Sequence, residues 1–162
     1  MKRIGLVLSI GVVLALLLAG CGGGGAPQVD WELKVTGAVD SPLTLSYADL
    51  VGMEQVDLTD VQMEKSTGET ELGSWSGAPL DAIFQQAGAS ANYVSVTAIA
   101  ADGYAIEISK DELQGAIVAL KKGDEWIAEA ASEEGKGPIR IVCPQTPGNR
   151  WVFQLQELQV NE

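Results

Sequence analysis

Short segments in which apolar and polar residues alternate make up most of the chain from residue 31 onward, and turn-forming residues such as glycine and aspartate separate them. Alternation with a period of two is the pattern of a half-buried β-strand, and segments this short exclude long helices. The pattern predicts about nine strands. They cover residues 31–35, 43–45, 56–63, a segment ending at Trp75, 93–98, 104–108, 117–120, 139–143 and 151–160.

The same region holds signals for two short helices. Ser46 is suited to cap a helix over residues 47–50, and Pro79 and Gly88 are suited to the start and the end of a second helix. The apolar residues of the second helix fall on one face, and they are Leu80, Ile83, Phe84 and Ala87. Many strands with few short helices predict one β-rich α+β domain with a single core, over residues 30–162.

The N-terminus has the pattern of a targeting segment. Lys2 and Arg3 precede an apolar run over residues 4–18, which is short for a membrane-spanning helix. The run ends in Leu-Ala-Gly-Cys and so resembles the lipobox of bacterial lipoproteins. We therefore expect residues 1–20 to be a signal peptide and Cys21 to be acylated; the alternative is an uncleaved helix with a chance cysteine.

A lipid-anchored protein of this kind would work outside the cytoplasm. Residues 21–29 begin with the cysteine and four glycines, which predicts a flexible tether between the lipid and the domain. The expected location is the extracytoplasmic face of the cell membrane, with membrane lipid as a partner through Cys21. If the cell has an outer membrane, the absence of aspartate at position 22 fits that destination.

Charge and composition exclude several classes of partner and site. The chain has 10 basic residues, 22 acidic residues and no histidine. Loss of Lys2 and Arg3 with the signal peptide leaves eight basic and 22 acidic residues, a net charge of −14. This charge repels nucleic acid and anionic lipid headgroups. The lack of histidine excludes Ser-His-Asp and Cys-His catalysis and histidine-ligated zinc, haem and copper.

Several motifs, in this order and spacing, resemble the molybdopterin-binding domain of the sulfite oxidase family. They are residues 31–39, residues 43–45 with 49–50, the W-x-G-x-x-L sequence at 75–80, the D-G-Y turn at 102–104, residues 137–144 around Arg140, which look like the family's G-x-P-x-R-x-x-x-P strand, and residues 148–152. The resemblance implies mixed sheets with short helices, a cleft for a pterin cofactor, and a molybdenum-dependent oxidoreductase as ancestor or relative.

One family feature is missing. The family binds molybdenum through a cysteine on the strand before the W-x-G turn, and residues 57–65 hold no cysteine. Cys143 shares a strand face with Ile139 and Ile141, so it is expected to be a buried core thiol if Arg140 faces the ligand. The n-region also lacks a twin-arginine signal, which indicates export as an unfolded chain. These features argue against molybdenum.

By resemblance, Arg140 and Arg150 lie near the terminal phosphate of the pterin cofactor, while the family's upstream histidine falls at Gly135. A guanidinium offers paired donors to a phosphate or carboxylate. The alternative is that both arginines pair with surface carboxylates, which contributes little.

The turn formed by Asp102, Gly103 and Tyr104 lies beside the cofactor cleft by the same resemblance; alternatively it is an ordinary Asp-Gly turn with a packed tyrosine. Trp75, Trp126 and Trp151 are expected in the core or at its rim.

Three functions remain open. The first, which we favour, is a binding module for a pterin or another small anion without molybdenum catalysis. The second is a molybdenum-cofactor oxidoreductase or its subunit, working with a redox partner. The third is an accessory lipoprotein that contacts another protein.

Overall fold

A computed structural model describes residues 25–64, 67–128 and 136–162. The expected signal peptide, Cys21, the first part of the tether and Gly135 lie outside these residues. Residues 25–31 form neither strand nor helix. None of the helices in the described parts of the chain has the length and apolar character that crossing a bilayer requires.

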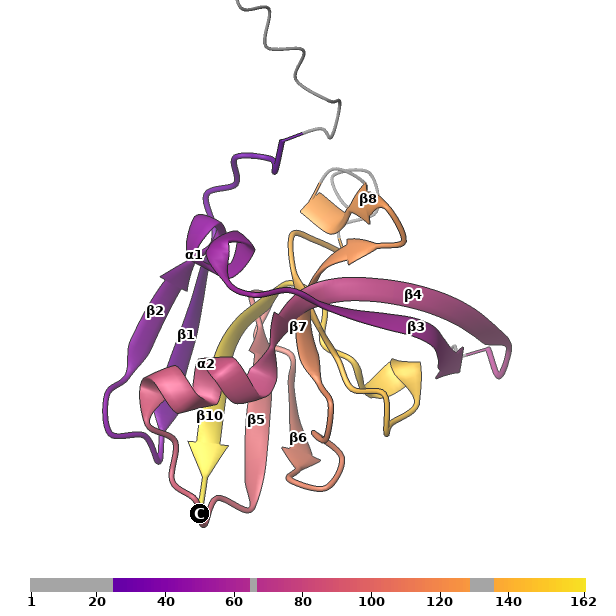
Figure 1. The fold of residues 1–162 in the computed structure, drawn as a ribbon. Helices are drawn as coiled ribbons and strands as arrows, with labels where there is room; N and C mark the ends of the chain where they lie inside the picture. Colours follow the sequence, from indigo (N-terminus) through magenta and orange to yellow (C-terminus); the bar gives the residue numbers. More distant parts are fainter. Residues whose placement is uncertain (1–24, 65–66, 129–135) are drawn as a thin grey trace, which may run out of the picture.

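The first of two sheets joins both ends of the domain (Figure 1). Its order is β2 (Leu43–Ser46), β1 (Glu32–Gly37), β10 (Leu155–Asn161), β5 (Ser95–Ala100) and β6 (Ala105–Ser109). Strands β1 and β10 run parallel, and the other pairs are antiparallel. The last strand of the sequence therefore lies in the middle of this sheet.

The second sheet carries the candidate site. Its order is β3 (Val56–Glu64), β4 (Thr70–Pro79), β7 (Ile117–Lys122) and β8 (Glu125–Trp126), and β9 (Arg140–Val142) also pairs with β7. All its pairs are antiparallel. Figure 1 shows the long β3–β4 hairpin extending away from the rest of the domain.

Both predicted helices are present. Helix α1 (Tyr47–Gly52) begins with a capping box, in which Ser46 and Asp49 each bond the other's backbone N–H. Helix α2 (Leu80–Ala87) lies across the first sheet (Figure 1) and ends at Gly88, whose φ of 65° is left-handed. Its four expected core residues are all buried. The prediction of a β-rich α+β fold with mixed sheets is confirmed.

The C-terminal strand differs from the prediction. A single strand over residues 151–160 was expected, but β10 begins only at Leu155. Gln154 has a φ of 48°, a conformation that a regular strand does not adopt. The 3₁₀-helix η1 (Gly148–Arg150) precedes this break, and Phe153 forms a separate bridge with Arg140. The break turns residues 151–153 toward β9 instead of along β10.

Candidate functional site

Arg140 lies on strand β9, which pairs with β7 of the second sheet, and three aromatic rings surround its guanidinium. Strand β9 places it opposite Ala119 of β7, and the bridge to Phe153 covers its other side. The central carbon of its guanidinium lies 3.9 Å from the ring centroid of Phe153, 4.5 Å from that of Trp75 and 5.3 Å from that of Trp151. Trp75 and Trp151 also contact each other edge to face, at 5.8 Å between centroids. We call these three rings the aromatic cage.

The guanidinium in this cage lacks hydrogen-bond partners along one edge. Arg140 is only 5% exposed, and its Nε and Nη2 atoms are buried without a partner. These two nitrogens form the side edge of the guanidinium, which can donate two parallel hydrogen bonds to one oxyanion. Burial lowers the pKa of Arg140 from its ordinary 12.5 to about 9, so the group is still charged at neutral pH. No carboxylate in the described part of the chain pairs with it.

Arg150 has different surroundings. It ends η1, and its Nη2 donates to the backbone oxygen of Glu107 at 3.1 Å and lies 3.1 Å from Oε1 of Glu112. Its Nε is buried without a partner. Arg150 therefore follows the carboxylate-pairing alternative, whereas Arg140 does not. The two arginines share no partner among the described residues.

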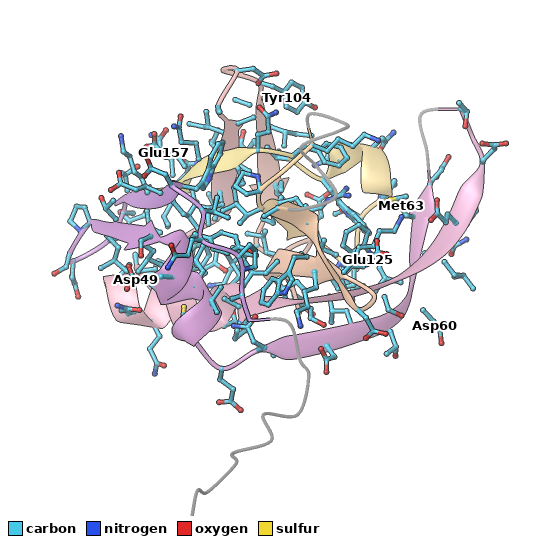
Figure 2. The ribbon with its side chains drawn as sticks, turned by 90° about the horizontal axis from the view of Figure 1, so that it is seen from above. Asp49, Asp60, Met63, Tyr104, Glu125 and Glu157 are labelled. Atoms are coloured by element: carbon cyan, nitrogen blue, oxygen red, sulfur yellow. The ribbon has the colours of Figure 1, made fainter. Side chains whose placement is uncertain are left out.

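The D-G-Y turn joins β5 to β6. Oδ1 of Asp102 accepts a hydrogen bond from the backbone N–H of Tyr104 at 2.9 Å, and Gly103 has a φ of 87°. Tyr104 is 52% exposed, and Figure 2 shows it at the outer end of the molecule in that view. The turn is bonded to the segment beside the aromatic cage, because Ala101 N–H donates to the oxygen of Gln154. Among the described residues, no hydrogen bond or ring contact joins this turn to Arg140.

Cys143 is the only thiol among the described residues, and it is fully buried. Burial is the largest cause that raises its pKa, to about 12, so it is a neutral thiol. The prediction of a core thiol is confirmed. The resemblance implies a cysteine thiolate as the molybdenum ligand, and the buried, neutral thiol of Cys143 does not fit that role. The edge of Arg140 fits an oxyanion.

The sequence did not identify the aromatic cage. Trp75 and Trp151 are buried and Trp126 is partly buried, as expected for core and rim positions. However, two of these rings enclose Arg140, and Phe153 was not singled out at all. The available signal was spacing, because residues 151 and 153 lie on one face of an extended segment. The indole Nε1 of Trp75 is also buried without a partner, which adds a third unpaired donor.

Comparison with known proteins places this chain in a family. The family model for the oxidoreductase molybdopterin binding domain matches residues 24–162. The chain belongs to this family. Its fold is similar to that of the sulfane dehydrogenase SoxCD from Paracoccus pantotrophus, with a TM-score of 0.71 and 19% identity, covering 85% of this chain. This molybdopterin-binding-type domain spans 40% of the length of that SoxCD chain. No curated protein sequence matches this chain at a significant level.

Proposed function

We propose that this protein is a membrane-anchored extracytoplasmic lipoprotein whose molybdopterin-binding-type domain binds a pterin or another small anion without molybdenum catalysis. The observation that carries the proposal is the unpaired edge of Arg140 inside the aromatic cage. A buried charge without a partner is strongly destabilising, so its presence indicates a group that completes it. A phosphate or carboxylate supplies the two oxygen acceptors that this edge requires.

The cage makes such a bond strong. Its three rings exclude water from the guanidinium, and a charge-assisted hydrogen bond gains strength where the dielectric is low. The ring centroids lie 3.9 to 5.3 Å from the central carbon of the guanidinium, close enough for a cation–π attraction that uses none of its N–H donors. The donors of Nε and Nη2 therefore remain without a partner inside the protein, and these are the donors that we propose an anion accepts from.

Family membership favours a second function, a molybdenum-cofactor oxidoreductase or a subunit of one. We rank it lower because the described thiol is neutral and buried and residues 57–65 lack cysteine. Elemental analysis of protein purified from molybdate-supplemented cells separates the two functions. Stoichiometric molybdenum would establish the oxidoreductase; its absence, together with anion binding, supports the binding module.

Sulfate is a suitable first probe for the Arg140 site, because its charge is constant across the useful pH range. We expect sulfate affinity to be flat between about pH 6 and 8 and to fall about tenfold per pH unit above about 9. The sign follows from the lowered pKa: the guanidinium loses its proton near pH 9, and the neutral form attracts no anion. Isothermal titration calorimetry measures the profile. Affinity unchanged up to pH 10.5 would contradict the role of Arg140.

The lipid anchor has its own test. Cys21→Ser removes the acylation site, so we expect the protein to move from the membrane fraction to the soluble fraction on cell fractionation. Cys143→Ala is the matched control, since it changes the other cysteine of the chain and leaves the anchor intact. A Cys21→Ser variant that stays in the membrane fraction after a carbonate wash would show that another segment holds the protein there.

A further inference from the structure

Arg150 begins the segment that supplies two of the three rings around Arg140. It ends η1, and Trp151 and Phe153 follow it directly. The backbone N–H of Arg150 donates to the oxygen of Pro147 and that of Trp151 to the oxygen of Gly148, so η1 is a hydrogen-bonded turn. The indole N–H of Trp151 donates to the oxygen of Cys143 and to Oγ1 of Thr146, each at 3.1 Å. The position of η1 therefore decides where both rings lie.

The side chain of Arg150 fixes η1 to a different part of the domain. Its Nη2 donates to the backbone oxygen of Glu107 in β6 and contacts both carboxylate oxygens of Glu112 in the turn that follows, at 3.1 and 3.3 Å. We call Arg150 and Glu112 the clamp. It links the second sheet's aromatic cage to the edge of the first sheet.

Glu112 is also held in place by hydrogen bonds that do not involve Arg150. The backbone N–H and the hydroxyl of Ser109 donate to Oε2 of Glu112 at 2.9 and 2.8 Å. These two hydrogen bonds, followed by the charge of Arg150, lower the pKa of Glu112, so it is ionised at neutral pH. A fixed carboxylate already neutralises Arg150, which leaves Arg150 a poor candidate for direct contact with a second anion.

We infer that Arg150 is a positioning residue, which acts through its clamp with Glu112 to hold Trp151 and Phe153 against Arg140, and that it does not bind the anion itself. This inference rests on the proposed anion site at Arg140. It assigns to Glu112, an acidic residue, a role in favour of anion binding, which is opposite to the effect of its charge.

The negative charge of Glu112 alone would repel an anion, whereas its proposed role favours anion binding. Removing that charge therefore tests the inference. Sulfate affinity is measured by calorimetry at a temperature well below the unfolding transition of every variant, so that a loss of stability alone does not change the result. Glu112→Gln and Arg150→Gln are each expected to weaken sulfate binding roughly five- to tenfold, and the double variant no further, because each change breaks the same pair. Arg150→Lys should restore part of the affinity. Asp111→Asn, the matched control, removes a neighbouring exposed charge outside the clamp and should not weaken binding.

Two results would overturn the inference. If Glu112→Gln leaves sulfate affinity unchanged or strengthens it, the clamp does not position the site. If Arg150→Gln weakens binding while Glu112→Gln does not, Arg150 contacts the anion directly. Should Arg150→Gln fail to fold, a comparison of the sulfate affinities of Glu112→Gln and Asp111→Asn is enough to decide. Wild-type protein that binds no sulfate overturns the proposed function as well, and so differs from failure of the clamp alone.

Discussion

Arg140→Met is expected to remove sulfate binding and at the same time to raise the free energy of unfolding of the ligand-free domain by about 2 kcal/mol. Methionine has a similar length and fits among aromatic rings without carrying a charge. The binding site and the stability of the fold thus place opposite demands on position 140.

The size of this effect follows from the surroundings of Arg140. One pKa unit corresponds to about 1.4 kcal/mol, so a pKa near 9 in place of 12.5 means that burial costs the charged form on the order of 5 kcal/mol. Contacts with the three rings offset roughly 1 kcal/mol each. An unfavourable balance of about 2 kcal/mol remains, and methionine removes it.

Urea unfolding measures the stability change, and calorimetry with sulfate measures the binding. Arg150→Met is the matched control, because that arginine has a carboxylate partner: its loss should lower stability, since it breaks the clamp. If Arg140→Met proves less stable than wild type, the guanidinium contributes more to the stability of the fold than its burial costs, and the proposed anion site at Arg140 loses its main support.

Gly77→Ala is expected to destabilise the domain by about 3 kcal/mol or more. Strand β4 passes so close to β7 that a Cβ at position 77 would overlap the carbonyl oxygen of Val118 and lie 2.6 Å from Cα of Ala119. Both neighbours are backbone atoms, so β7 itself would have to move. Ala119 is the residue that pairs with Arg140, and a shift of β7 should also weaken sulfate binding.

Gly52→Ala provides the control for that change. Position 52 is in α1, and an added Cβ there meets no atom within 4 Å. The substitution should be neutral or slightly stabilising, because alanine reduces the freedom of the unfolded chain. Thermal unfolding measures the stability of both variants. If Gly77→Ala and Gly52→Ala lose the same stability, the close approach of β4 and β7 does not depend on glycine at position 77.

The strands and helices could largely be predicted from the sequence, because alternation and capping are local signals. Ser46, Pro79 and Gly88 each marked the helix boundary where the structure places one. The break at Gln154 could not be predicted, since a left-handed conformation at a residue other than glycine depends on the surrounding fold. Asp60, with a φ of 54°, interrupts β3 for a similar reason.

The candidate site was predicted in part. The resemblance indicated Arg140, and alternation predicted that Cys143 would face the core. Alternation could not show that Arg140 would also be buried, because that requires Trp75 and Phe153 to arrive from other segments of the chain. Nor could it select Glu112 as the partner of Arg150 from 22 acidic residues. Such pairings depend on tertiary contacts between distant segments.

The central place of β10 in the first sheet has a consequence for biogenesis. The β1–β2 and β5–β6 pairs can form without β10, but they cannot join into one sheet until residues 155–161 have been synthesised, because β10 lies between β1 and β5. A nascent polypeptide that engages a secretion channel by its N-terminus would therefore reach it without a completed sheet, in the threadable state that such a channel needs. For a chain exported as we propose, the first sheet would then be completed only after β10 has crossed the membrane.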